Sequence, residues 1–467
     1  MWRSIIYLAT ALHFIISPAV ARNITVPLYK RTIPPFYAAN GEELNDGLLA
    51  GEMFIGNPPQ KMKLVFDTTS GYTWARGSQC KSENCLDRCT FYTRRSRSIE
   101  YTGLRHSVSY GDACVDTKVW KDTVEFAGVQ IPHSYFGVAN RMNGFDHGFD
   151  GYFGLGPAVK FGNGKYHTTA SSSLQKRDGA PSTFLSAAFQ LGLISSPQFS
   201  IYITTGGGTS GNSVVQPTTA APLPAAPAPA PAPAQPAQPA APAPVQQAAP
   251  QNNNVIPNPP SPQQQYPAAT GFIKRGQHLY EQAPVGQLIF GGIDQTKIDG
   301  DIHYLPLSSP RKNEVKGWNI CLQKAEFGDK LRLHQYKYAI ASISSSSPYI
   351  TLPPSQADCF HEKFGAVYQQ STGTYTVKCS KLKSLPPLIL EFDSITVELP
   401  ADVWTGVTDS GQNCCHTKIR RGSSEHDWVL GTTFTHAFYS VFDSEKDAIG
   451  FGLLKGSENG VKIQVKN

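Results

Sequence analysis

Charged residues are scarce in this chain, and no basic stripe is visible in it. Asp, Glu, Lys and Arg together make up 16% of the 467 residues, and the net charge is +6. Without a basic stripe, the composition gives no support to nucleic-acid binding. Methionine is also rare, with 4 residues against 24 Phe and 20 Tyr, and this balance favours a β-rich class over a helical bundle.

Long apolar runs are missing after the first residues of the chain. Residues 1–21 combine Arg3, a mostly apolar stretch and Ala19–Ala21, which has the small-x-small pattern of a signal-peptide cleavage site. The stretch is too short to span a bilayer comfortably and Pro18 interrupts it. We therefore expect a secreted protein, free or at the cell surface, with no membrane span. Asn23 begins an Asn-x-Thr sequon and is a candidate glycosylation site.

Two parts of the chain consist of short strand-like segments separated by Gly, Pro, Asn and Asp, which is typical of an all-β protein. One helix is expected around residues 183–191. Between the two parts, residues 204–282 are rich in Pro, Ala and Gln and poor in the residues that build a core, so we expect a disordered insert. The expected segments are a signal peptide (1–21), an N-terminal segment (22–44), a first β lobe (45–203), the insert (204–282), a second β lobe (283–456) and a tail (457–467).

Several motifs follow one another in an order that points to one family. Phe66–Ser70 places an aspartate after an apolar strand, and Tyr110–Asp112 lies in an expected hairpin. The supporting pieces are Ile55–Gln60, Phe149–Gly156, Gly291–Asp294, Trp428–Gly431, Phe442-Asp443 and Ile449–Gly452. Together they resemble the pepsin-type aspartic endopeptidases. The resemblance implies an all-β bilobal fold with a central cleft, a flap hairpin over it, and residues 22–44 as a possible remnant of a prosegment.

The family's chemistry uses two aspartates, one from each lobe, which share a proton and act on a water molecule. In the first lobe the resemblance makes Asp67 the catalytic aspartate. Thr69 stands where the family has a glycine, and a β-branched residue there restricts the turn. The resemblance also assigns supporting hydroxyls to Thr68 and Ser70, and cleft and flap roles to Trp74, Tyr110 and Gly111.

The second lobe lacks its aspartate. Counting back from Leu352-Pro353 puts Ser344 in the aspartate position, and no Asp or Glu occurs between Lys330 and Asp358. By the same count, Ser345 takes the bracing hydroxyl position, Ser346 the glycine position and Ser347 the final hydroxyl position. A serine is neither a useful acid nor a useful base in the acid-to-neutral pH range, so catalysis is expected to be lost or strongly impaired.

Nine cysteines in an exported chain predict disulfides. The resemblance pairs Cys80 with Cys85 and Cys379 with either Cys414 or Cys415, and we expect Cys414 to be the partner. Pairs between Cys89 and Cys114 and between Cys321 and Cys359 are guesses, because connectivity does not follow from sequence. The spacing of Cys and His fits no zinc site, and we expect neither metal nor cofactor.

Three hypotheses about function follow. The first is a non-catalytic family member, a monomer that binds an extended peptide or protein in the cleft. The second is an acid protease that works with Asp67 alone, with a water held by Ser344. The third is a surface or inhibitor-like interaction protein whose cleft is vestigial and whose insert matters more.

Overall fold

The computed structural model describes residues 37–44, 47–111, 113–159, 161, 183–203, 286–309, 317–337, 339–370, 373–406 and 414–466. The expected signal peptide, Asn23, most of the N-terminal segment and the insert at 204–282 lie outside the described residues. Asp112 and the side chain of Cys414 also lie outside them.

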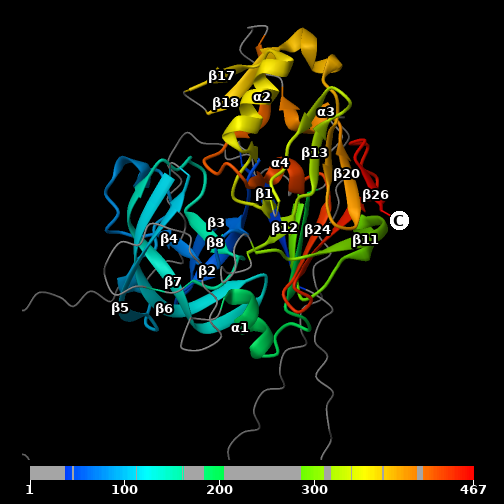
Figure 1. Cartoon of the computed structure of the whole chain (residues 1–467). Helices are drawn as coiled ribbons and strands as arrows, with labels where there is room; N and C mark the ends of the chain where they lie inside the picture. Colours follow the sequence, from blue (N-terminus) through cyan, green and yellow to red (C-terminus); the bar gives the residue numbers. More distant parts are fainter. Residues whose placement is uncertain are drawn as a thin grey trace, which may run out of the picture. The chain divides into compact units, whose positions relative to one another are not determined.

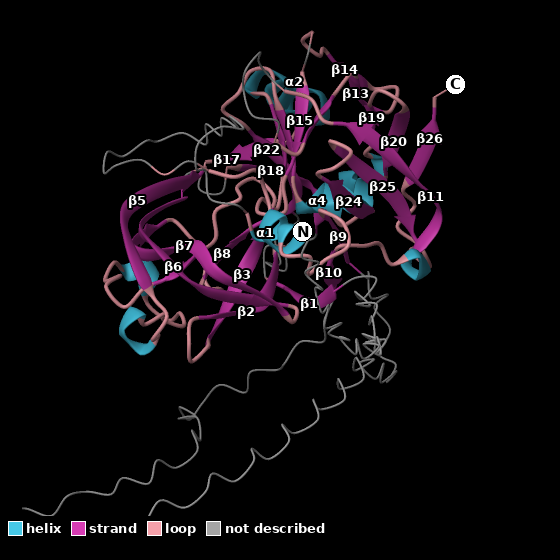
Figure 2. Ribbon diagram, turned by 90° about the horizontal axis from the view of Figure 1, so that it is seen from below, coloured by secondary structure: helices cyan, strands magenta, loops and turns pink. Residues whose placement is uncertain are grey.

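Strands dominate the described chain, and its helices are short (Figure 2). The strands up to the insert are β1 (Tyr37–Glu43), β2 (Leu49–Ile55), β3 (Gln60–Asp67), β4 (Trp74–Arg76), β5 (Glu100–Tyr110), β6 (Ala113–Phe126), β7 (Val129–Asn143), β8 (Gly151–Gly154) and β9 (Gln198–Ile203). The helix α1 (Phe184–Gln190) lies where a helix was expected, and Thr183 caps it by accepting from Ser186 N. This confirms the all-β class of the first lobe.

The second half also consists mainly of strands with a few short helices (Figure 1). Its strands are β10 (Gly286–Phe290), β11 (Ile298–Pro306), β12 (Asn319–Cys321), β13 (Lys324–Phe327), β14 (Leu331–Leu333), β15 (Ile340–Ile343), β16 (Ile350–Leu352), β17 (Val367–Gln369), β18 (Thr374–Lys378), β19 (Leu388–Glu391), β20 (Ile395–Leu399), β21 (Thr405–Gly406), β22 (Cys414–Arg421), β23 (Trp428–Leu430), β24 (Tyr439–Asp443), β25 (Ala448–Leu454) and β26 (Lys462–Val465). Its helices are α2 (Pro354–Phe364), α3 (Ala401–Trp404) and α4 (Thr432–Thr435). None of the helices in the described residues is long and apolar enough to cross a membrane.

The two halves share one strand topology. The first half contains the order β2-β3-β8-β4-β7-β6-β5, and the second contains β12-β15-β23-β16-β22-β18-β17. If the strands of each run are numbered along the chain, both runs have the same spatial order, 1-2-7-3-6-5-4. The parallel pairs correspond as well, because β3–β8 and β4–β7 match β15–β23 and β16–β22. The molecule therefore carries the same motif twice, as a bilobal fold requires.

A further run of antiparallel strands joins the two halves, in the order β11-β25-β24-β9-β10-β1. Aromatic residues from both halves pack on it: Phe199 of β9 stacks on Phe442 of β24 with ring centroids 4.6 Å apart. Strand β1 pairs with β10, and β26 near the end of the chain pairs with β20. The folded body thus extends beyond the boundaries expected at residues 45 and 456, because strand pairing recruits both flanking segments.

Candidate functional site

Asp67 and Ser344 occupy equivalent places in the repeated motif. Asp67 ends β3, which runs parallel to β8, while Ser344 directly follows β15, which runs parallel to β23. A glycine that follows each partner strand, Gly156 after β8 and Gly431 after β23, lets the motif turn pack directly against the backbone there. A Cβ on Gly156 would lie 2.6 Å from Ser70 N, and one on Gly431 would lie 2.2 Å from Ser347 O. The backbone therefore holds the two motif turns in matching positions.

The two turns are locked together by a reciprocal set of hydrogen bonds. Thr68 donates from its N to Ser345 Oγ at 3.1 Å and from its Oγ1 to Ile343 O at 2.9 Å. In return, Ser345 donates from its N to Thr68 Oγ1 at 3.0 Å and from its Oγ to Phe66 O at 2.6 Å. Both side chains are buried. The bracing hydroxyls expected from the sequence thus meet each other across the lobes.

The carboxyl group of Asp67 is fully buried, at 0% exposure. Its Oδ1 accepts hydrogen bonds from Thr69 N at 2.9 Å, Thr69 Oγ1 at 2.5 Å and Ser346 Oγ at 2.9 Å. Its Oδ2 is buried without a hydrogen-bond partner of good geometry among the described residues. Burial is the largest influence on this group and raises its pKa; the hydrogen bonds from Thr69 and Ser346, and more weakly from the Tyr110 hydroxyl, lower the pKa of Asp67.

Ser344 does not bind Asp67 directly in any hydrogen bond of the described residues. The Ser344 Oγ lies 3.4 Å from Ser346 Oγ, which in turn donates to Asp67. Ser346, at the position where the resemblance leads us to expect glycine, thus places a hydroxyl against the carboxyl group. The sequence already indicated a side chain at positions 69 and 346, but not that both hydroxyls would turn onto the same oxygen.

The other two expected hydroxyls have different partners. Ser70 Oγ accepts from Tyr72 N at 3.1 Å. The backbone oxygen of Ser347 accepts from Thr432 N at 2.7 Å and so ties the second turn to α4. In this structure, the hydrogen bonds of Ser70 Oγ and of the Ser347 backbone brace the turns themselves.

The expected flap is the hairpin of β5 and β6. Tyr110 pairs with Ala113, and Gly111 has a φ of +65°, the left-handed conformation that a tight turn requires. Trp74 Nε1 donates to the Tyr110 hydroxyl at 3.0 Å. The Tyr110 ring also packs against Tyr152 and Phe145, with centroids 4.5 and 5.7 Å apart. Two aromatic residues that the sequence reading did not single out thus hold the flap tyrosine down beside Asp67.

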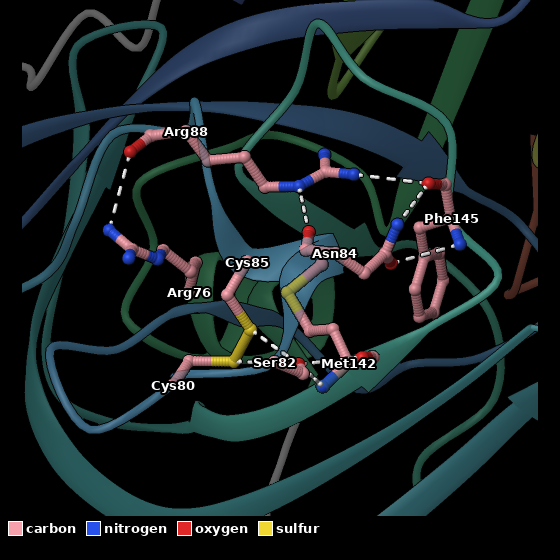
Figure 3. Close-up of a disulfide and its surroundings, with 8 residues drawn as sticks. All are labelled: Arg76, Cys80, Ser82, Asn84, Cys85, Arg88, Met142 and Phe145. Atoms are coloured by element: carbon pink, nitrogen blue, oxygen red, sulfur yellow. Dashed lines mark hydrogen bonds between the residues drawn. A yellow bond between two sulfur atoms is a disulfide. The ribbon is translucent and has the colours of Figure 1, made fainter.

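A disulfide loop supports this aromatic cluster (Figure 3). Cys80 is bonded to Cys85, as expected. Within the loop, Asn84 Nδ2 donates to Phe145 O at 2.6 Å and Asn84 Oδ1 accepts from Phe145 N at 3.0 Å. The buried guanidinium of Arg88 donates to the backbone oxygens of Phe145, Asp146 and Phe149. The loop therefore fixes the segment that carries Phe145.

The second disulfide joins Cys379 to Cys415, not to Cys414. Cys415 is fully buried and lies opposite Val377 on β18, the strand that leads into Cys379. Adjacent residues of a strand point to opposite faces, so Cys414 and Cys415 cannot both face Cys379. The guessed pairs are wrong: Cys89, Cys114, Cys321 and Cys359 are free thiols. Cys89 lies in the loop held by Asp150, whereas Cys114 lies beside the flap turn; Cys321 is in β12 and Cys359 in α2.

With this geometry in hand, comparison with known proteins identifies the class. Residues 49–215 and 276–454 match the family model of the eukaryotic aspartyl proteases, so the chain belongs to that family. Gastricsin from Callithrix jacchus is 22% identical over 414 residues, covering 87% of this chain and 81% of its own length. Pepsin A from Suncus murinus is 23% identical over 407 residues, covering 86% and 79%. Embryonic pepsinogen from Gallus gallus is 22% identical over 404 residues, with the same coverage of 86% and 79%.

Proposed function

We propose that this chain is a non-catalytic member of the aspartyl protease family that binds an extended polypeptide between its lobes. The observation that carries the proposal is that Ser344, a neutral hydroxyl, stands in the second lobe at the place equivalent to Asp67, where a second carboxylate would be needed. The family's mechanism needs one group to take a proton from water while the other donates one to the substrate carbonyl. Serine does neither in the acid-to-neutral range.

The surroundings of Asp67 support the same conclusion. The hydroxyls of Thr69 and Ser346 both donate to Oδ1, where an attacking water would otherwise be activated. Losing one partner of an acid–base pair lowers a rate by about 10²- to 10⁴-fold. Occupation of the remaining carboxylate by protein hydroxyls lowers it further.

Peptide binding is supported by two structural features around the site, the interlock of the two turns and the flap hairpin. The interlock of Thr68 with Ser345 holds the lobes together, and the flap hairpin with Tyr110 is still formed. A peptide would be held as an extended strand, mainly through its own main chain. The disulfides are those of a chain that folds in an oxidising compartment, which supports secretion or display outside the cell.

Proteolysis of an unstructured protein from about pH 2 to about pH 7 tests the proposal. We expect no cleavage by the purified chain, and an Asp67→Asn variant that behaves identically. Cleavage that disappears in Asp67→Asn would establish the alternative, an acid protease with a single aspartate.

A further inference from the structure

Apart from a weak interaction with the Tyr110 hydroxyl, one oxygen of the remaining carboxyl group has no hydrogen-bond donor among the described residues. Asp67 Oδ1 accepts from Thr69 and Ser346, whereas Oδ2 is buried and has no partner of good geometry within the described parts of the chain. A buried acceptor without a donor costs free energy. A ligand that brings a hydrogen-bond donor to Oδ2 therefore gains more binding free energy here than it would at an exposed carboxylate.

The charge at the site differs from that of a pair of aspartates. Two carboxylates that share a proton present a donor and an acceptor together and suit a neutral hydroxyl. Here the second group is Ser344, and the hydroxyls of Ser344 and Ser346 lie 3.4 Å apart beside Asp67. An ammonium group carries one positive charge and several N–H donors, so it fits one carboxylate and adjacent hydroxyl acceptors.

We infer that this site selects a polypeptide that places an amine, from a lysine side chain or an amino terminus, against Asp67 Oδ2. The inference rests on the proposed peptide-binding function and specifies its ligand. It differs from a preference for neutral transition-state-like groups, because the site has a single carboxylate.

Entry to the site requires the flap tyrosine to lift. The Tyr110 hydroxyl is held by Trp74, and its ring packs on Tyr152. A Cβ on Gly111 would meet nothing within 4 Å, so no packing contact at this position opposes such a movement.

Calorimetric titration of the full-length chain tests the inference. The probes are three peptides of one sequence that differ only in the central linkage: an ordinary amide, a reduced amide that is a protonated secondary amine, and a hydroxyethylene. We expect the reduced amide to bind at least about tenfold more tightly than the hydroxyethylene. Peptides with lysine or norleucine at the centre, and with free or acetylated amino termini, then distinguish the two sources of the amine.

Two variants give the controls. Asp67→Asn should abolish the preference for the amine, while Asp358→Asn, a change of the same kind at the exposed ion pair with Arg421, should keep it. Ser344→Asp provides a second carboxylate and should improve hydroxyethylene binding by about tenfold, independently of how Asp67→Asn folds. Equal binding of the amine and hydroxyl peptides by the unaltered chain would overturn the inference alone. Failure of all three peptides to bind would overturn the proposed function as well.

Discussion

Hydroxyl side chains have two separate roles in the motif turns. Thr68 and Ser345 face each other, and each donates and accepts within a buried interlock. Thr69 and Ser346, for which the resemblance leads us to expect glycines, both donate to Asp67. The first pair of hydroxyls stabilises the junction of the lobes, and the second pair occupies the Asp67 carboxylate. Different residues of the turns therefore serve stability and determine the chemistry of Asp67.

Removing one interlock hydroxyl should destabilise the protein. In Ser345→Ala the Phe66 carbonyl loses its donor and the Thr68 amide its acceptor, both in a buried place. We expect a loss of about 1–3 kcal/mol in the free energy of unfolding, measured by urea denaturation. Ser345→Thr keeps the hydroxyl and is the matched control. If Ser345→Ala unfolds at the same urea concentration as the unaltered chain, the interlock does not stabilise the junction.

Among the elements, the flap depends on a segment distant from it in sequence. Phe145 contacts the Tyr110 ring, and Arg88 and Asn84 hold Phe145 from the disulfide side (Figure 3). Arg88 also binds the backbone oxygens of Asp146 and Phe149 in the same segment. Arg88 lies 8% exposed, and its guanidinium is satisfied by backbone oxygens of this segment and of Asn84. The flap tyrosine is thus positioned through a chain of contacts that ends at the Cys80–Cys85 bridge.

Arg88→Met should loosen the flap as well as the segment. Several backbone oxygens would lose a buried charged donor, and we expect a loss of about 2–4 kcal/mol in unfolding free energy. Hydrogen exchange should rise both in residues 145–149 and in β5 and β6. Arg97→Met changes an exposed arginine in the same way and should leave both regions protected. Faster exchange confined to residues 145–149 would show that the flap is held independently of this segment.

The whole molecule should lose stability in acid. Burial lowers the pKa of His106 to about 4 and that of His436 to about 3. The folded chain keeps these rings neutral while the unfolded chain protonates them near pH 6.5, so the unfolding free energy falls as the pH drops from 6.5 towards 4. Asp67 and Asp150 act in the opposite direction, because burial raises the pKa of each carboxyl.

Replacing His106 isolates its contribution. His106→Leu keeps an apolar side chain against Tyr72 and Phe161. Between neutral and acid pH the free energy of unfolding should fall in both proteins. We expect the fall to be smaller in the variant by on the order of 1–3 kcal/mol, measured by denaturation at each pH. His147→Gln, at an exposed histidine, is the control. Parallel pH profiles for the unaltered chain and His106→Leu would exclude His106 as a source of acid sensitivity.

The sequence predicted the all-β class and the helix near residue 183, because these follow from local patterns, while the Cys80–Cys85 bridge was implied by the family resemblance. It did not predict the partner of Cys379, since the choice between adjacent cysteines depends on which face of β22 is buried. Nor did it indicate Tyr152 and Phe145 as flap contacts, because their packing on Tyr110 joins segments far apart in the chain. The hydroxyls on Asp67 depended on side-chain rotamers, which a motif does not specify.

Restoring the motif tests the central claim most directly. The claim is that activity is absent because of the residues at positions 69, 344 and 346. The measurement is the rate of hydrolysis of an unstructured protein at acid pH by the unaltered chain and by the triple variant Thr69→Gly, Ser344→Asp, Ser346→Gly. We predict a gain of at least about 100-fold in the triple variant, lost again when Asp67→Asn is added. A folded triple variant that is no faster than the unaltered chain, or an unaltered chain whose cleavage depends on Asp67, would contradict the claim.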